Sequence, residues 1–596
     1  MLRSLNPHQL KGSVNLKAQK LAVDVASGRQ KGSLLLKHAN LINVFSQEIS
    51  LNHVLLAGPL IAAVGEDYHA AEAEEVIDLE GQYLAPGLID GHMHLESSLL
   101  SPAAYAAAVV PRGVVAVVCD PHEIGNVAGV AGIKWLLAAS EGLALDVWVT
   151  VSSCVPATAL ETSGASLGLS EIDELLGLER VLGVAEIMDF PSVIAGDEET
   201  LAKVLLAEHY RKTPEGHAPS LTGKALQSYL AAGIISDHEA TTLAEGLEKL
   251  RAGVFVMIRE GSVTRNLAAL MPLICPEYAA SIGFVTDDRL PHDLMDEGGV
   301  DFLVKTAIQA GIDPALAFRC GSLNLAKHFK LIRRGGIAAG YFADMMVLSD
   351  LKNFKVESVF KHGQKVAEAG KLIETSFVKP QPDATVVSRS VKLPALSAQD
   401  FRFSASDGDH LIQVIIPVTG QVLTERQEFK VRAQGSEIKA NASANLAKLV
   451  CVERHGKKGH VAKAFVKGFG LKAGALASSV AHDHHNILAI GMNDDDLLLA
   501  CQELARLDGG WVVVSEGKVL ASLPLPIAGL ITDRNIAEVR LDVDRLEAAA
   551  QSLGTDIDAP FMTLSFLGLE VIPELRLTDL GLVDVFGNRL VDVLIS

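Results

Sequence analysis

Eight short apolar runs alternate with stretches of helical period between residues 86 and 330, and this alternation constrains the fold most. The runs are GLIDGHMHL, GVVAVVCD, LDVWVTV, VLGVAEI, TPEGHAP, GIISDHE, GVFVMIRE and IGFVTDD. Strands that alternate with helices form parallel βα units, and eight such units close into a (β/α)8 barrel. We therefore predict an α/β protein with a TIM-like barrel over residues 86–330, in which TPEGHAP is the weakest strand candidate.

Short β-like segments flank the predicted barrel on both sides. Residues 33–85 and 331–375 contain apolar runs broken by Gly, Asn and charged residues, and we predict that the two halves form one composite β domain. Residues 376–390 hold two prolines and several Ser and Thr, as linkers do, and residues 391–596 are expected to form an additional mixed α/β C-terminal domain. Residues 1–32 are predicted to be an arm that forms a surface helix or a subunit contact, with a transit peptide as the alternative.

Composition and charge limit the class of partner. Hydrophobic residues make up 49% of the chain and charged residues 21%, which excludes wholesale disorder. The 52 Lys and Arg stand against 72 Asp and Glu, so the chain lacks the positive charge that nucleic-acid binding needs. No apolar stretch reaches the roughly 18 residues of a membrane span, and the dispersed cysteines contain no C-x-x-C pair, as in a reducing compartment. We expect a cytoplasmic protein that binds neither nucleic acid nor a membrane.

Histidines and carboxylates end five of the eight apolar runs. The first run ends with two histidines and four others end with one such residue each: His92 and His94, then Glu186, His217, His238 and Asp287. Residues two apart in a strand point to the same side, so the histidine pair can reach one metal ion. Catalytic groups of a barrel gather at the C-terminal ends of its strands. Four imidazoles and two carboxylates at that end are the mixture that binds two divalent cations bridged by a carboxylate.

Each of these residues also has an ordinary structural interpretation. A single histidine in an apolar context is most often part of the core or the surface, Glu186 can begin a helix, and Asp287 can cap one. The joint placement at five strand ends favours the metal centre.

Further polar residues follow the first two runs. CDPHEIGN, at the end of the second run, contains Asp120, His122 and Glu123. These residues can bind an extra metal ion or contact a substrate; alternatively, Asp120 belongs to a strand-ending turn and Glu123 begins a helix. Glu96, after the first run, can recognise a substrate or cap the next helix.

Two more groups lie at the seventh run and in the C-terminal region. Arg259 and Glu260 end the seventh run, and we expect them to form an ion pair, near the pocket or purely structural. SSVAHDHHN places His482, Asp483 and His485 just before the apolar run ILAIG. We expect this turn to pack over the open face of the barrel as a lid; a solvated turn before a strand is the alternative.

Several long motifs carry a family resemblance. APGLIDGHMHLESS resembles the first barrel strand of the amidohydrolase superfamily, which carries Pro-Gly-x-Ile-Asp-x-His-x-His. Within that superfamily, the chain is similar to the adenine deaminases of bacterial type. The segments that carry this similarity are DPHEIGNVAG, EIMDFPSVI, KTPEGHAPSLTGKALQSYLAAGIISDHE, MIREGS, FVTDDRLPHDLMDEGGVD, GALASSVAHDHHNILAIGMNDDD and LPLPIAGL. The resemblance covers about residues 30–590.

The resemblance implies a set of metal ligands and a reaction. It implies one histidine pair for each of two divalent cations: His92 and His94 for the first, His217 and His238 for the second. Glu186 would bridge the two cations, and Asp287 would bind the first and transfer protons, so that Asp287, Glu186 and His238 surround the reacting atoms. The reaction would be the hydrolytic deamination of adenine, a small purine base, to hypoxanthine and ammonia. Mn²⁺ or Fe²⁺ are the expected metals, with Zn²⁺ as the alternative, and a homo-oligomer, most simply a dimer, is expected.

Two other functions stay open at this point. One is a different hydrolase of the same superfamily that acts on a cyclic amide or amidine, similar to dihydroorotase or hydantoinase. The other is a catalytically inactive relative that serves as a scaffold. Three features weigh against a different hydrolase: the glutamate bridge, the CDPHEIGN motif and the C-terminal motifs. The presence of all six predicted ligands weighs against an inactive scaffold. The zinc deaminases with a P-C-x-x-C motif are excluded, because this chain has no such motif.

Overall fold

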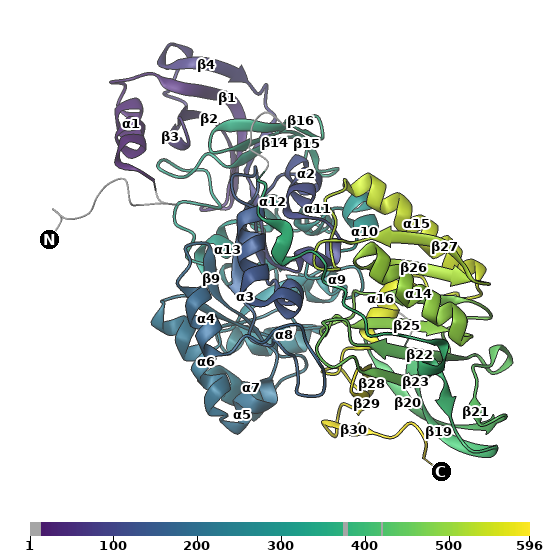
Figure 1. The fold of residues 1–596 in the computed structure, drawn as a ribbon. Helices are drawn as coiled ribbons and strands as arrows, with labels where there is room; N and C mark the ends of the chain where they lie inside the picture. Colours follow the sequence, from purple (N-terminus) through teal and green to yellow (C-terminus); the bar gives the residue numbers. More distant parts are fainter. Residues whose placement is uncertain (1–13, 374–379, 419–420, 596) are drawn as a thin grey trace.

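The barrel lies at the centre of the computed structural model, which describes residues 14–373, 380–418 and 421–595 (Figure 1). Parts of the predicted arm and linker, residues 1–13 and 376–379, lie outside these ranges. The barrel strands are β6 (Leu88–Met93), β7 (Val114–Cys119), β8 (Asp146–Val151), β9 (Val181–Ile187), β10 (Thr213–Gly216), β11 (Ser236–Asp237), β12 (Phe255–Arg259) and β13 (Ile282–Val285).

The eight strands form one parallel ring. Five pair in the order β10-β9-β8-β7-β6 and three in the order β11-β12-β13. The amide of Ile235 donates to the carbonyl of Pro214 at 3.4 Å, which joins β10 to β11, and the amide of Asp287 donates to the carbonyl of His92 at 3.0 Å, which joins β13 to β6. The predicted (β/α)8 barrel is confirmed.

The fifth and sixth strands are short, and the backbones of neighbouring strands approach each other closely there. A Cβ atom on Gly183 would lie 2.0 Å from the carbonyl oxygen of Thr213, and one on Gly216 would lie 2.1 Å from that of Ser236. The pairing of β10 with β9 also shifts register between Pro214 and Gly216. Glycine at both positions allows this close approach.

Helices surround the barrel and connect its strands. They are α2 (Pro102–Val109), α3 (His122–Ala139), α4 (Leu169–Leu176), α5 (Phe190–Ala195), α6 (Glu198–His209), α7 (Gly223–Ala231), α8 (Leu243–Arg251), α9 (Leu267–Leu270), α10 (Pro291–Asp296), α11 (Val300–Gln309), α12 (Pro314–Cys320) and α13 (Leu323–His328). Many begin at a side-chain cap, as when Ser101 accepts from the amide of Ala104 at the start of α2.

A nine-stranded sheet combines strands from both sides of the barrel in the sequence. It contains β1 (Gly32–Asn43), β2 (Glu48–Ala57), β3 (Leu60–Val64), β4 (Ala73–Asp78), β5 (Tyr83–Pro86), β14 (Met345–Asp350), β15 (Lys355–Lys361), β16 (Gln364–Glu368) and β17 (Lys371–Leu372). Antiparallel pairing of β5 with β14 joins the two halves. Helix α1 (Leu16–Ala26) covers part of this sheet with Ala22 and Val25.

The C-terminal region is built on an eight-stranded sheet of order β20-β19-β23-β22-β25-β24-β26-β27. Its strands are β19 (Gly408–Pro417), β20 (Thr424–Ala433), β22 (Leu446–Val452), β23 (Val461–Lys467), β24 (Ala475–Ser478), β25 (Ile487–Gly491), β26 (Gly510–Ser515) and β27 (Lys518–Pro524). The other elements are β18 (Phe403–Ser404), β21 (Glu437–Ile438), β28 (Leu575–Thr578), β29 (Gly581–Asp584), β30 (Arg589–Val591), α14 (Asp494–Leu507), α15 (Ile536–Ser552) and α16 (Pro560–Phe566).

This C-terminal region packs directly against the barrel. The amide of Ser101 donates to the carbonyl of Thr532 at 2.7 Å, and the amide of Thr532 donates to that of Leu99 at 2.9 Å. One buried apolar cluster contains side chains of both regions. All six cysteines are free, and within the described part of the chain no helix combines the length and apolar character that a bilayer crossing requires.

Candidate active site

The C-terminal ends of the barrel strands bring the six predicted metal ligands together. The side chains at these strand ends meet inside the barrel mouth: His92, His94, Glu186, His217, His238 and Asp287. His217 is half-buried and the other five are buried. Each follows or ends a parallel strand, so the fold delivers them to one place.

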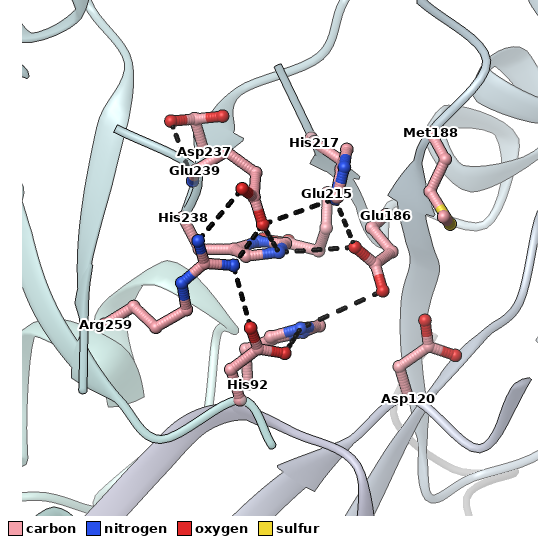
Figure 2. A network of polar contacts seen from close by, with 12 residues as sticks. His92, Asp120, Glu186, Met188, Glu215, His217, Asp237, His238, Glu239 and Arg259 are labelled. Atoms are coloured by element: carbon pink, nitrogen blue, oxygen red, sulfur yellow. Dashed lines mark hydrogen bonds and ion pairs between the residues drawn. The ribbon is translucent and has the colours of Figure 1, made fainter. Parts of the chain in front are cut away.

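Glu186 lies between His92 on one side and His217 and His238 on the other (Figure 2), and it also faces His94. Its Oε2 atom lies 2.6 Å from Nδ1 of His217 and 3.2 Å from Nε2 of His238. Its Oε1 atom lies 3.5 Å from Nε2 of His94 and 4.0 Å from Nε2 of His92. The two oxygens of one carboxylate therefore face different histidine pairs, which is the arrangement of a bridging ligand.

Asp287 faces the first histidine pair. Its Oδ1 atom lies 3.0 Å from Nε2 of His94 and 3.5 Å from Nε2 of His92. The buried Nε2 atom of His92 has no hydrogen-bond partner in the described part of the chain. Nδ1 of His94 donates to the backbone carbonyl of Asp120 at 3.1 Å, which leaves its Nε2 lone pair directed into the site. These donor atoms fit a metal ion.

Arg259 and Glu239 complete the polar surroundings of the ligands. The guanidinium of Arg259 donates to Oδ2 of Asp287 at 2.8 Å and to Oε2 of Glu239 at 3.0 Å. Glu239 in turn lies 3.4 Å from Nε2 of His238. Burial alone would raise the pKa of Asp287, but the charge of Arg259 and the nearby imidazoles of His92 and His94 hold this pKa well below its usual range. Asp287 is therefore an ionised carboxylate.

The predicted ion pair between Arg259 and Glu260 is wrong. Neighbouring residues of a strand point to opposite sides, so Arg259 turns to the site while Glu260 accepts from the amide of Leu267 at 2.9 Å. Sequence reasoning also missed Glu239. Its signal was its place directly after His238 at the end of the sixth run.

Buried hydrogen bonds hold the loops that carry the second histidine pair. Asp237 accepts from the amide of Ala218 at 2.8 Å, and the buried ammonium of Lys249 donates to Asp237 at 2.8 Å. The hydroxyl of Tyr229 accepts from the amide of His217 at 2.9 Å and donates to the carbonyl of Ile187 at 2.8 Å. The loops after β10 and β11 are thus fixed, and so are their imidazoles.

The residues predicted as a second cluster lie beside this site. Asp120 follows β7, and its Oδ1 atom accepts from the hydroxyl of Ser152 at 2.7 Å. His122 and Glu123 begin α3 and are buried. One oxygen of Glu96 accepts from the amide of Ile124, in the first turn of α3, at 3.1 Å. The next helix along the chain, α2, is capped by Ser101 and not by Glu96.

The C-terminal turn reaches this second cluster. His482, Asp483 and His485 are all buried, so the alternative of a solvated turn is wrong. Asp483 lies 3.5 Å from Nε2 of His122. The ring of His485 stands edge-on to that of His482, with 5.7 Å between centroids. A segment far along the chain therefore closes against the barrel loop that follows β7.

Comparisons with known proteins identify the family of the chain. The model "Amidohydrolase family" matches residues 83–366, and the model "Adenine deaminase C-terminal domain" matches residues 421–588. "Adenine deaminase 2" of Carboxydothermus hydrogenoformans is 43% identical over 579 residues, which are 97% of this chain and 100% of that protein. "Adenine deaminase" of Desulfatibacillum aliphaticivorans is 44% identical, over 94% of this chain and 97% of the relative. "Adenine deaminase" of Dehalococcoides mccartyi is also 44% identical, over 96% and 98%. The chain is therefore a member of the adenine deaminase family, within the metal-dependent amidohydrolases.

Proposed function

We propose that this protein hydrolyses the exocyclic amine of adenine and releases hypoxanthine and ammonia. The observation that carries the proposal is Glu186, whose two oxygens face two different histidine pairs. The relatives named adenine deaminases support the choice of substrate, because they align with nearly the whole chain, barrel and C-terminal region together.

The residues at the strand ends would hold two divalent cations. His92, His94 and Asp287 would bind the first, His217 and His238 the second, with Glu186 shared between them. We propose Mn²⁺ or Fe²⁺, with Zn²⁺ as the alternative, because imidazole and carboxylate ligands suit all three. When bound, such cations lower the pKa of water to roughly 7 and so supply a nucleophile at neutral pH.

The side chains of this protein would then manage the protons. Asp287, kept ionised by Arg259, is placed to accept a proton from the attacking water and to deliver it to the leaving amine. His238 is stacked on His92 at 4.1 Å between ring centroids, so the two imidazoles fix each other's planes. We assign Asp287, Glu186 and His238 to the immediate surroundings of the reacting atoms.

Ammonia release from a panel of substrates tests this proposal. We expect the Mn²⁺-loaded protein to deaminate adenine and to leave adenosine nearly untouched. Dihydroorotate and hydantoin belong in the same panel, because they report the other hydrolases of the superfamily. Turnover of adenosine at a comparable kcat/KM, with adenine inert, would contradict the assignment.

Two further properties are proposed from the sequence. Dispersed free cysteines agree with a reducing compartment, so we place the enzyme in the cytoplasm. We also propose a homo-oligomer, most simply a dimer, and light scattering of the purified protein would measure its mass.

A further inference from the structure

We propose that a third divalent cation binds between the barrel and the C-terminal region. Its ligands would be His122 and Glu123 from the start of α3 and His482 and Asp483 from the turn before β25, which we call the interdomain site. This proposal goes beyond the deaminase reaction, and it holds or fails whatever the substrate is.

Four distances between the donor atoms lie close to the spacing of a metal site. Nε2 of His122 lies 3.5 Å from Oδ1 of Asp483 and 3.6 Å from Oε1 of Glu123. Nδ1 of His482 lies 3.7 Å from the same Asp483 oxygen and 3.9 Å from the same Glu123 oxygen. Good hydrogen bonds of this type are about 2.7–3.2 Å long. Ligands placed tetrahedrally at about 2.0–2.1 Å from a metal are roughly 3.3–3.4 Å apart, so a contraction of a few tenths of an ångström would complete the site.

The carboxylates of this site lack a permanently charged partner and most of their hydrogen bonds. Both oxygens of Glu123 and the Oδ2 atom of Asp483 are buried without a hydrogen bond in the described part of the chain. Glu123 is 1% exposed and Asp483 is 4% exposed. Within the described residues, every ion pair of these two carboxylates is with a histidine, and none is with Lys or Arg. Buried carboxylates without a permanent positive charge are strongly unfavourable, and a cation would remove that cost.

The imidazoles are already oriented toward a cation. Nδ1 of His122 faces Oδ2 of Asp120 at 3.3 Å, and Asp120 is itself held by the hydroxyl of Ser152. With the hydrogen on Nδ1, which the carboxylate of Asp120 can accept, the lone pair of Nε2 would point to the interdomain site, as in carboxylate–histidine–metal triads. The ring of His482 is stacked on Phe566 at 5.4 Å between centroids. Both rings are therefore fixed by neighbours outside the site.

A cation at this site would join two parts of the chain. Two of its ligands begin the barrel helix α3 and two belong to the C-terminal turn, so binding would hold that turn against the barrel mouth. Nδ1 of His122 also lies 3.7 Å from Glu186. One nitrogen of this ring therefore faces the proposed cation pair, and the other, Nε2, faces the interdomain site directly beside it. Imidazole and carboxylate ligands select a divalent transition metal, and Zn²⁺ is a suitable probe.

Metal content and anomalous scattering test the interdomain site. We expect the wild type, loaded with excess Zn²⁺ and freed of unbound metal, to retain about three ions per chain, given four ligands for a structural site. Crystals measured at the zinc absorption edge should show an anomalous difference peak within bonding distance of Nδ1 of His482. The variants His482→Gln and Asp483→Asn should each retain about two ions and lose that peak. His485→Gln removes an imidazole of the same turn outside the site and should keep all three ions.

Wild-type crystals decide the question even if a variant fails to fold. Zinc peaks confined to the barrel ligands, with the wild type saturating at about two ions, would overturn the proposal. So would purine density in this cluster without an anomalous signal after soaking with adenine, because the cluster would then belong to the substrate. None of these readouts depends on deamination, so failure of the proposed activity and failure of this site can be told apart.

Discussion

The two ends of the barrel both bury charged side chains, but they pair them differently. At the N-terminal end, Lys361 lies 2.6 Å from Asp146 and 2.9 Å from Asp344. Arg334 lies 2.7 Å and 2.8 Å from the same two carboxylates. At the C-terminal end, the described carboxylates around the site face mainly imidazoles, at 2.6–4.0 Å. Asp287 and Glu239 also meet Arg259, and Asp237 behind them meets Lys249.

The difference separates a structural use of buried charge from a chemical one. Lysine and arginine are permanently charged at neutral pH, so Asp146 and Asp344 are neutralised within the protein. Imidazole is neutral over much of the same pH range and keeps a lone pair for a metal ion. Burial alone does not distinguish the ends, whereas unpartnered nitrogens such as Nε2 of His92 do.

Metal removal should affect activity most. Chelation should abolish deamination, because water at neutral pH supplies too little hydroxide without a bound cation. Circular dichroism should still report a folded barrel, since the paired network at its other end needs no metal. Mn²⁺ should restore turnover. Full activity in protein shown by elemental analysis to be metal-free would contradict the proposal that the C-terminal end of the barrel works through bound metal.

Replacement of the shared carboxylate should have the next largest effect. Glu186→Gln should lower the metal content of the barrel site from about two ions toward one, because a neutral amide bridges two cations poorly. Turnover should fall further than in the other single variants described below. Elemental analysis of the folded variant checks this, and two tightly held ions in the barrel would refute it.

Replacement of Asp287, the proposed proton-transferring carboxylate, should have the third largest effect. Asp287→Asn should lower kcat at least ~10²-fold, as expected when a general acid–base group is removed. Asparagine keeps an oxygen toward the metal but cannot transfer the proton. Near-normal turnover with metal retained would show that another group moves the proton.

The arginine of the C-terminal end should have a smaller effect. Arg259→Lys keeps the charge but loses the fork that joins Asp287 to Glu239, and we expect a loss of roughly 10-fold in kcat, typical of partners that orient a ligand. Arg259→Gln should lose more, because the charge that lowers the pKa of Asp287 is gone. Equal rates in all three proteins would show that this pairing is only structural.

A lysine of the N-terminal end should leave activity nearly unchanged and affect stability instead. Lys361→Met leaves two carboxylates short of a partner, which costs about 3–5 kcal/mol for a buried pair. Although burial raises the pKa of Asp344, Lys361 and its neighbours bring that pKa below its usual value. The stabilisation is therefore present above about pH 4 and is lost as the pH falls through the lowered pKa.

Thermal unfolding at two pH values checks this last prediction. The melting temperature of Lys361→Met should lie well below that of the wild type at pH 7, and the gap should narrow in acid. The kcat of the folded variant at a permissive temperature should match the wild type. A large loss of kcat without a loss of stability would mean that the two ends of the barrel are coupled.

The barrel and the meeting of the proposed metal ligands at its mouth could be predicted from the sequence because they follow from local rules. Alternation of strands and helices predicts the ring, and strand periodicity puts His92 and His94 on one side. The ends of parallel strands meet, so Glu186 and Asp287 could be assigned to the same site without knowing any distance. The partner of Arg259 could not be found this way, because the nearest carboxylate in the chain, Glu260, points to the opposite face of the strand.

What the sequence by itself determined is therefore the set of residues that each strand end presents, since side-chain direction along a strand is a local property. The tertiary structure alone decided which of these residues pair with elements from elsewhere in the chain. Glu239 meets Arg259 because β11 and β12 are neighbours in the ring, and His122 meets Asp483 because the C-terminal sheet packs on the barrel. Such contacts depend on how whole surfaces fit together, and no local pattern in the chain encodes that fit.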